Sequence, residues 1–531
     1  MPPLPEPVTP EPLTAEPPTD ETVVAEVTAA VAGYEAALMA DDLDELDRLF
    51  LDAPHTLRAD ASGVLVGHRA ISDFRRGRGG APARTVTRLH VVPVAGGAAV
   101  AVAETLRPDG TRGLQTQTWV PTADGWRIAA AHVSSTPPAD RGPGAVWRER
   151  GSPLVRGSGA GPLAGVQVAV KDLFAVAGHR VGAGNPVYLA GARTETVTAP
   201  AVAALLTAGA DVAGIVQTDE FAYSLAGRNV HSGAPVNPRA PGRAVGGSSS
   251  GPAAAVAAGQ AAVGLGTDTA GSIRVPASYT GLFGLRTTHG SVSIEGLLPL
   301  APSFDTVGWL TATGRLLDDV AAVLLPPATT LPAGVLLAED LLALAEPGVA
   351  DLLRAEAGRL AGHWGLPLST GRLVEDGERE TWFEAFRTMQ AAQAWAAHGT
   401  WLTAHPGTVG EDVAARFAAA ARVTPAEAAA AADVVAGARR VLRDRVPAGL
   451  VVALPAASGP APWLGAGGAS VEAARGATLR LTSLASTAGL PAVALPAGVV
   501  DGAPVGLCLL TAAEQDRALT ALAATADAVP T

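Results

Sequence analysis

The sequence is almost without lysine: of its 38 lysine and arginine residues, Lys171 is the single lysine. The two cations differ chemically, because a guanidinium keeps its proton in a protein whereas a buried lysine amine can be neutral and act as a base. Lys171 directly follows the apolar run 166–170, which is typical of a buried strand. An ammonium group there loses solvation unless it is paired or neutral. We therefore expect a chemical role for Lys171, rather than chance survival in an arginine-rich composition.

Cysteine is equally scarce, with Cys508 as the only one. A single cysteine excludes a framework of disulfides and a metal site built from thiolates. We expect no metal and no cofactor, and a reduced compartment, the cytoplasm, fits this composition.

Positive charge is in deficit, since the formal net charge is −12 and the pI is near 5.3. This argues against nucleic-acid and anionic-membrane partners, because no basic surface large enough for phosphates is expected. Long apolar runs are missing too, since none approaches the ~18–20 residues of a membrane span. Residues 1–20 are rich in Pro and Glu, lack the features of a signal peptide and are predicted to be a disordered tail.

Residues 21–137 have a pattern of their own, in which helices come first and strands follow. Apolar residues recur at helical spacing over 23–38, and an acidic turn leads from there into a second short helix. The strand-like segments that follow are 56–60, 63–67, 84–93, 98–106, 114–122 and 125–134. Asp-Gly pairs at 109–110 and 124–125 are typical of hairpin turns. This order predicts an α+β cone built on antiparallel strands.

Residues 138–158 are rich in Pro, Gly, Ser and charged side chains and are predicted to be a linker. Beyond them, in residues 159–531, short apolar strands alternate with helical segments. The expected strands are 166–170, 211–217, 261–266, 450–455, 492–496 and 505–510, and the expected helical segments are 200–208, 253–258 and much of 340–445. Such alternation predicts an α/β domain in which helices cover a sheet.

Two loops rich in Gly and Ser, 246–259 and 264–278, carry the strongest functional signal. Their glycines permit sharp turns that aim backbone N–H groups inward. Pro252 fits the first position of a helix, so the first loop is expected to lead into a helix N-terminus, which favours negative charge. The second loop follows an apolar strand and places Ser272 near its end. Successive N–H groups around 269–271 can form a nest for an oxyanion.

Two other interpretations of these glycine-rich segments are weaker. Residues 247–251 match the G-x-S-x-G elbow of α/β-hydrolases, with Ser249 as the nucleophile. That elbow needs a buried strand before it, yet 237–243 is a loop of Pro, Gly and Arg. It also needs a paired histidine, and no distinctive motif surrounds His289, His363, His398 or His405. The Gly-rich stretch 157–161 precedes a strand instead of following one, which argues against a dinucleotide site.

Taken together, these segments resemble the amidase signature family from about Pro162 to the end of the chain. The matching segments, in the family's order, are 170–172, 220–222, 235–238, 246–259, 266–276, 488–492 and 504–507. The resemblance implies a large mixed sheet sandwiched by helices and a Ser–Ser–Lys triad that works through an acyl-enzyme. In that triad Lys171 is the base, Ser248 the bridging serine and Ser272 the nucleophile.

The same resemblance implies an oxyanion hole made by the backbone N–H groups of Thr269, Ala270 and Gly271. The family's cis peptide would fall at Gly247–Ser248. The chain departs from the family at Ala270, where many members have Gly, and at Pro252, where Ser or Gly is common. The first change keeps the N–H group, and the second only removes an N–H at a helix start.

Residues 21–137 resemble the AtzH-like domains of the SnoaL-like superfamily. The matching residues are Tyr34, the turn 41–46, Arg58, Gly67 and the final strand 126–134. The resemblance implies a small pocket, for which Tyr34, Arg58 and His132 are candidate groups, with Arg58 able to bind a carboxylate. Each has a structural alternative: a core tyrosine, a surface ion pair and a packed strand histidine. The domain could equally be a docking or dimerisation module without chemistry of its own, which leaves a homodimer open.

The sequence thus predicts an enzyme that cleaves a small C–N amide. AtzH-like proteins resemble partners of amidases that handle biuret- and urea-like compounds, which implies a small nitrogenous, carboxylated substrate and a place in nitrogen metabolism. The alternative is an amidotransferase subunit that delivers ammonia to an acceptor. The acidic charge and the absence of a basic patch count against that alternative.

Overall fold

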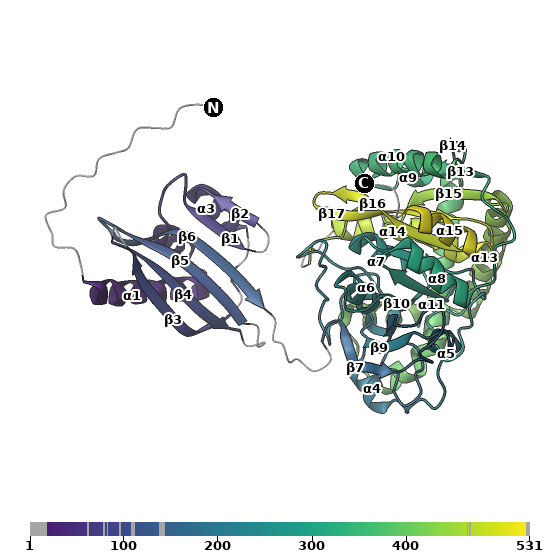
Figure 1. Ribbon diagram of the computed structural model, residues 1–531, viewed down its shortest axis with the longest axis horizontal. Coiled ribbons are helices and arrows are strands. Elements are labelled where there is room, and N and C mark those ends of the chain that lie inside the picture. Colours follow the sequence, from purple (N-terminus) through teal and green to yellow (C-terminus); the bar gives the residue numbers. More distant parts are fainter. Residues whose placement is uncertain are drawn as a thin grey trace. The chain divides into compact units, whose positions relative to one another are not determined.

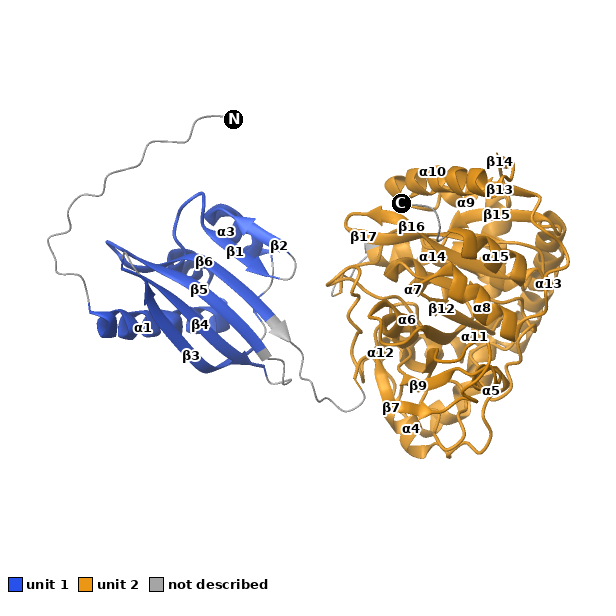
Figure 2. Ribbon diagram, in the orientation of Figure 1, with its two compact units in different colours: residues 1–141 blue, residues 142–531 orange. Residues whose placement is uncertain are grey.

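The computed structural model describes residues 19–60, 63–77, 80–81, 83–94, 97–107, 112–136, 144–464, 466 and 469–526. The chain divides into two compact units, residues 1–141 and residues 142–531 (Figure 2). The tail predicted at 1–20 lies outside the described residues, apart from Thr19 and Asp20. The hairpin signal at 109–110 also lies outside them.

In the described part of the first unit, helices pack on a six-stranded sheet of order β2-β1-β6-β5-β4-β3 (Figure 1). The helices are α1 Asp20–Ala40, α2 Leu43–Leu49 and α3 His68–Arg76; the strands are β1 Leu57–Asp60, β2 Gly63–Val66, β3 Thr85–Val94, β4 Ala98–Leu106, β5 Arg112–Thr122 and β6 Gly125–Thr136. The predicted α+β architecture is confirmed. The expectation of antiparallel strands is wrong for one pair, because β1 runs parallel to β6 with Leu57 opposite Ala130. α3 lies between β2 and β3 and was not predicted.

The apolar face of helix α1 forms part of the hydrophobic core of this unit. By length and composition it is apolar enough to span a membrane, but its apolar residues instead pack on one face of the sheet. Its buried residues include Val23, Val27, Val31, Tyr34 and Leu38, which lie in one cluster with Trp119 and Ile128. A stripe at this spacing is the mark of a helix that covers a core.

The second unit is a mixed eleven-stranded sheet covered by helices, as predicted. Its strand order is β14-β13-β15-β17-β16-β11-β12-β10-β8-β9-β7 (Figure 1). The strands are β7 Trp147–Val155, β8 Gln167–Lys171, β9 Asp211–Val216, β10 Val263–Asp268, β11 Phe283–Arg286, β12 Thr306–Thr311, β13 Gly334–Ala338, β14 Leu368–Gly371, β15 Leu450–Pro455, β16 Ala492–Val500 and β17 Ala503–Leu510. The helices are α4 Pro186–Gly191, α5 Pro200–Thr207, α6 Ser250–Ala257, α7 Arg274–Thr280, α8 Gly314–Leu324, α9 Glu339–Leu342, α10 Pro347–Trp364, α11 Asp376–Ala404, α12 Glu411–Ala420, α13 Pro425–Arg445, α14 Ala469–Ala488 and α15 Asp516–Ala526, with a 3₁₀ turn at Glu220–Ala222.

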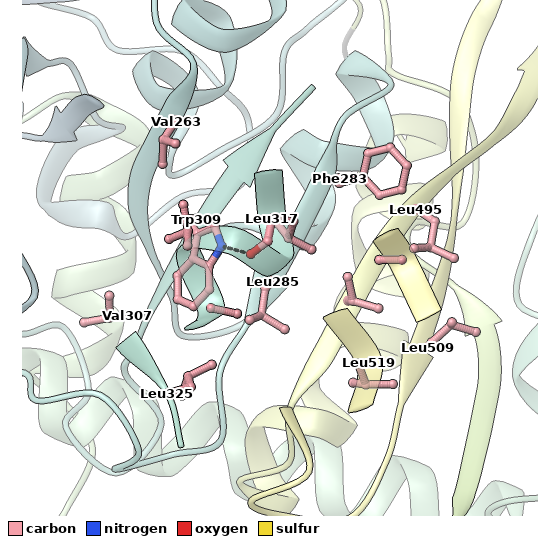
Figure 3. Close-up of a cluster of buried hydrophobic side chains, with 14 of the residues drawn as sticks. Val263, Phe283, Leu285, Val307, Trp309, Leu317, Leu325, Leu495, Leu509 and Leu519 are labelled. Carbon is pink, nitrogen blue, oxygen red and sulfur yellow. Dashed lines mark hydrogen bonds between the residues drawn. The ribbon is translucent and has the colours of Figure 1, made fainter. Parts of the chain in front are cut away.

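The sheet has a hydrophobic cluster on each of its faces. Along β15, Val451 and Ala453 belong to one cluster and Val452 and Leu454 to the other, because successive side chains of a strand point to opposite faces. The first cluster includes Trp309, whose Nε1 donates to the carbonyl oxygen of Leu317 at 3.1 Å (Figure 3). Strands buried on both faces explain why the sequence shows continuous apolar runs here instead of alternation.

The predicted linker 138–158 needs a correction, because its second half is strand β7. This strand pairs antiparallel with β9, and Trp147 donates from its indole N–H to Gln260 Oε1 at 2.6 Å. The strand was not predicted because it contains Pro153, and a proline within a segment argues against a strand. A proline is tolerated here because β7 is the edge strand and its register shifts between Arg150 and Val155.

The topology brings the functional segments to one edge of the sheet. β8 and β10 are parallel neighbours, with Leu265 opposite Val170, so both strands end on the same side. Lys171 is the last residue of β8, and Thr267 and Asp268 end β10. Sites in α/β proteins typically lie at the carboxyl ends of parallel strands.

Candidate active site

Lys171 is fully buried at the end of β8, where its amine meets three hydroxyl groups. Within the described residues, its Nζ lies 2.8 Å from Ser248 Oγ, 3.0 Å from Ser249 Oγ and 2.8 Å from Thr267 Oγ1. A neutral amine has two hydrogens and one lone pair, so it can donate to two of these hydroxyls and accept a proton from the third. The predicted pairing of Lys171 with Ser248 is therefore present in the structure.

The electrostatic environment favours the neutral form of Lys171. Burial lowers the pKa of Lys171 to about 7, against the opposing effect of the Asp219, Asp268 and Asp305 carboxylates. Loss of solvation penalises the charged amine, and none of these carboxylates makes a direct ion pair that would offset it fully. Near neutral pH a substantial fraction of the amine is thus able to accept a proton.

Ser249 is held in a way that suits a supporting role and excludes the hydrolase-elbow interpretation. Its side chain is fully buried, it accepts a hydrogen bond from Lys171, and its own hydroxyl donates to Thr267 O at 3.2 Å. An elbow nucleophile must be exposed at the tip of its turn. Because the Ser249 proton is engaged with a carbonyl, Ser248 is the serine of this pair that remains able to pass a proton to the amine.

The serine loop is packed against its neighbours so closely that two glycines are required. A Cβ at Gly247 would overlap the Asp219 carboxylate, and a Cβ at Gly266 would lie 2.7 Å from Ser249 Oγ. The Gly247–Ser248 peptide is cis, as the family resemblance implied. The following helix α6 begins at Ser250, two residues before Pro252, which was predicted to open it.

Ser272 lies in the second loop, which the structure joins to the first. The Ser249 N–H donates to the carbonyl oxygen of Ser272 at 3.3 Å, so the two loops are connected through their backbones. Ser272 is itself buried and precedes α7. The structure thus brings together the three segments that carry Lys171, Ser248 and Ser272.

Asp268 organises the second loop and was missed by sequence analysis. Its carboxylate accepts hydrogen bonds from Gly271 N at 2.9 Å and Ile273 N at 3.1 Å, and it pairs with Arg274 Nη2 at 2.8 Å and Arg286 Nη1 at 3.1 Å. Burial would raise the pKa of Asp268, but the two guanidinium groups hold it well below its usual range. The carboxylate is therefore a fixed anion around which the loop folds.

This arrangement corrects the predicted oxyanion hole. Gly271 directs its N–H to Asp268 and is therefore already engaged, whereas Thr269, Ala270 and Ser272 donate their N–H groups to no acceptor that the described residues contain. The error arose because the pattern of the loop does not reveal that Asp268 turns back on it. Thr269 is fixed separately, since its hydroxyl donates to Asp305 Oδ1 at 2.6 Å.

In the first unit, Tyr34 and Arg58 are both buried, as a pocket would require, but each has a packing role. Arg58 pairs with Asp60 at 2.8 Å and lies over the Phe74 ring at 4.3 Å. A second buried arginine, Arg75, was missed. It lies over the Phe50 ring at 4.1 Å and donates to Leu46 O at 2.9 Å.

The structure corrects the predicted pocket group, because His132 does not lie with Tyr34 and Arg58. Its register partner is Ala59, whereas Arg58 pairs with Ala131, so the strand alternation sends His132 to the opposite face of the sheet. There it is exposed. In the described part of the chain, no group of three or more His, Cys, Asp or Glu side chains is arranged to hold a metal ion.

Comparison with known proteins agrees with these observations. The Amidase family model matches residues 149–325, and the AtzH-like family model matches residues 19–138. The chain is 33% identical over 401 residues to Amidase 1 of Arabidopsis thaliana, a match that spans 70% of this chain and 94% of that protein. Over 240 residues it is 37% identical to a glutamyl-tRNA(Gln) amidotransferase subunit of Natronomonas pharaonis, which covers 44% of this chain and 53% of that protein.

Two further likenesses are to a solved structure and to a hydrolase subunit. A solved structure described as a crystal structure of amidase superposes with a TM-score of 0.62 at 31% identity, over 69% of this chain and 85% of that one. AtzE, named as a 1-carboxybiuret hydrolase subunit of Pseudomonas sp. strain ADP, is 45% identical over 155 residues, which is 29% of this chain and 33% of that protein.

Proposed function

The chain belongs to the amidase family, enzymes that hydrolyse amide bonds, and we propose that it cleaves a small amide through Lys171, Ser248 and Ser272. The observation that carries this proposal is the 2.8 Å contact between Lys171 Nζ and Ser248 Oγ, made by an amine whose pKa burial lowers to about 7. A buried, neutral lysine beside a serine hydroxyl is an activated base, and general-base activation is what a serine nucleophile needs.

The proposed reaction begins with two proton transfers. Neutral Lys171 takes the proton of Ser248, and Ser248 takes the proton of Ser272 as Ser272 Oγ attacks the amide carbonyl carbon. The oxyanion that forms is stabilised by the N–H groups of Thr269, Ala270 and Ser272. Collapse breaks the C–N bond, and the leaving nitrogen receives a proton through Ser248, which leaves an acyl-enzyme on Ser272.

Deacylation uses the same groups in reverse order. A water molecule attacks the acyl carbonyl while its proton passes through Ser248 toward Lys171, and the departing Ser272 oxygen is reprotonated. The net reaction consumes one water and releases a carboxylic acid and an amine or ammonia. No metal or cofactor enters this scheme.

We further propose a carboxylated or urea-like amide as the substrate, in the setting of nitrogen metabolism. Over 155 residues the chain is 45% identical to a protein named as a 1-carboxybiuret hydrolase subunit, whose named substrate is both carboxylated and urea-like. The first unit matches the AtzH-like family model, which supports the same substrate class.

The alternative is a role in an amidotransferase, and the likeness to a glutamyl-tRNA(Gln) amidotransferase subunit supports this alternative. The net charge of −12 counts against a partner as anionic as transfer RNA. An assay of ammonia release from small amides separates the two, because a hydrolase needs no acceptor. Ammonia release that Ser272→Ala abolishes supports the hydrolase, whereas release that survives Ser272→Ala contradicts the triad.

For the first unit we propose self-association through the sheet face that α1 does not cover. Large apolar side chains are exposed there on several strands: Leu57, Val64, Val66, Val92 and Leu114 belong to this set. The charged side chains Arg88 and Glu104 on this face form an ion pair with each other at 3.7 Å, so they leave no net charge that would repel a second copy. A second copy of the same apolar face is therefore a fitting partner. The first unit would thus assemble as a homodimer.

A further inference from the structure

Asp219 is a fully buried carboxyl group beside the candidate active site, and the proposed reaction does not use it. It lies shortly after Val216, the last residue of β9. Val216 is opposite Lys171 in the parallel pair of β8 and β9, so both strands end at the same edge of the sheet. The topology thus places a buried carboxyl group near the proposed base.

The segment that carries Asp219 also holds the serine loop. The Asp219 N–H and the Thr218 hydroxyl both donate to the carbonyl oxygen of Ser248, at 3.1 Å and 3.0 Å. The Asp219 carboxylate fills the space that a Cβ at Gly247 would occupy, so it packs directly against the residue before Ser248. The Gly227 N–H donates to Asp219 Oδ2 at 2.9 Å and fixes the orientation of the side chain.

The charge of Asp219 is not neutralised by a direct ion pair. Burial raises the pKa of Asp219 to about 6, against the opposing effects of the Gly227 N–H, the Ser250 hydroxyl and the Lys171 amine. Arg416 of α12 also interacts with it electrostatically, but no cation among the described residues forms an ion pair with it. Near pH 7 the group is therefore a buried anion, which is stabilised by any positive charge that forms close to it.

Three carboxylates influence the amine of Lys171, and Asp219 differs from the other two. Burial lowers the pKa of Lys171, and the carboxylates oppose this effect, Asp219 most strongly and Asp268 and Asp305 less. Asp268 is already paired with two arginines. Asp305 accepts the Thr269 hydroxyl on one oxygen and two backbone N–H groups on the other. Of the three, Asp219 alone has an oxygen, Oδ1, that meets no donor in the part of the chain that the structure describes.

We propose that Asp219 is the counter-charge for the ammonium group that Lys171 becomes when it accepts the proton of Ser248. This inference rests on the proposed function, and it adds a positioning residue to the triad. Asp219 accepts no proton in this role. Its negative charge stabilises the protonated base, as a carboxylate does for the histidine of a serine–histidine–aspartate triad, and this makes Lys171 a stronger proton acceptor.

The single lysine of the chain makes this proposal directly measurable. Protein grown with lysine that is ¹³C-labelled at Cε gives one lysine side-chain signal, and its shift between about pH 5 and 9 reports the pKa of Lys171 without turnover. We expect Asp219→Asn to lower that pKa by about one pH unit, because the ammonium loses its nearest uncommitted anion. The acidic limb of kcat/KM on an uncharged amide should move to lower pH by the same amount. The plateau should fall by up to about tenfold, because a weaker base takes the Ser248 proton less readily.

Asp516→Asn is the matched control. Asp516 is also buried, burial also raises its pKa, and its carboxylate accepts hydrogen bonds from Thr288 at 2.6 Å. It is not one of the three carboxylates that act on Lys171, so the lysine signal should titrate as in the wild type. Circular dichroism and Tm establish that each variant is folded. Asp219→Ser, which also removes the charge, replaces Asp219→Asn if that variant does not fold, and it should shift the titration in the same direction.

The lysine titration and the turnover assay distinguish failure of this proposal from failure of the proposed function. A pKa of Lys171 that is unchanged or higher in the folded variant, in an enzyme that still hydrolyses amides, overturns the proposal alone. The same holds if kcat falls while the pH profile stays in place, since Asp219 would then only support the serine loop. A lowered pKa of Lys171 in a protein that hydrolyses no amide would uphold the electrostatic pair and overturn the hydrolase.

Discussion

Lys171 Nζ lies 2.8 Å from Ser248 Oγ at the end of a buried strand, with two more hydroxyls as its remaining partners. This contact joins the base to the serine loop, and the Ser249–Ser272 backbone bond joins that loop to the next. The cations nearest to that second loop, Arg274 of α7 and Arg286 of β11, are guanidinium groups paired with Asp268. The lysine is therefore the cation in this constellation that can exchange a proton near neutral pH.

The pKa of Lys171 predicts the pH dependence of catalysis. Since burial lowers it to about 7, the amine is protonated and inactive below that pH and neutral above it. We expect kcat/KM to rise about tenfold per pH unit below pH 7 and to level off above it, because this parameter reports the free enzyme. Initial rates on an uncharged amide between about pH 5 and 9, with Tm measured alongside, provide the check. A profile that is flat or falling through this range in a folded enzyme contradicts the assignment of the base.

Ser248 and Ser249 should differ sharply in their effects. Ser248→Ala removes the proposed proton relay and should reduce kcat by about 10²- to 10⁴-fold. Ser249→Ala removes only one of three hydroxyls around the amine, and we expect a loss of about tenfold or less. The two purified variants are compared by kcat on one substrate. If Ser249→Ala is the more damaging change, the roles of the two serines are reversed.

Asp268 should support both stability and activity. Asp268→Asn leaves Arg274 and Arg286 buried without their common counter-ion and should lower the free energy of unfolding by about 3–5 kcal/mol. The second loop, which carries the N–H groups proposed for the oxyanion hole, should lose order. We therefore expect kcat to fall even under conditions in which the Asp268→Asn protein remains folded. Denaturant unfolding measures the first effect, with the exposed Asp351→Asn as control. Unchanged stability would show that the Asp268 cluster does not hold the loop.

The open sheet face of the first unit predicts an assembly. Val92→Glu and Val64→Glu place charge on exposed apolar positions without touching the core of the unit, and they should convert a dimer into a monomer. Light scattering coupled to gel filtration gives the mass, and turnover should be unchanged. His132→Ala, on the same face, is the milder companion variant. A wild-type protein that is already monomeric would refute this proposal directly.

Much of the architecture could be predicted from local pattern. The strands β8, β10, β15 and β17 are continuous apolar runs, and Lys171 was expected at the end of the first of them. Helical spacing of apolar residues was sufficient for α1. Such signals succeed because they arise from burial, which each segment shows in its own composition.

The features that were missed depend on contacts between distant segments. Thr267 and Ser249 complete the surroundings of Lys171 only because β8 and β10 are parallel neighbours, which no single segment reveals. Gly271 was assigned to the oxyanion hole, but its N–H group donates to the Asp268 side chain instead. The direction of that side chain cannot be predicted from the pattern of the loop. His132 was named as a pocket candidate together with Arg58, but the register places Ala131 opposite Arg58, and this offset of one residue sends His132 to the other face of the sheet.

The most direct test of the account is the turnover of Lys171→Arg, with Lys171→Ala beside it. Arginine keeps the positive charge but cannot serve as the proton acceptor, since a guanidinium stays protonated in proteins. Circular dichroism and Tm first establish that each variant is folded, and ammonia release is then measured on the best amide. We predict that kcat falls by about 10²- to 10⁴-fold in both variants. A folded Lys171→Arg enzyme with near-normal turnover would contradict the central claim that this lysine is the base.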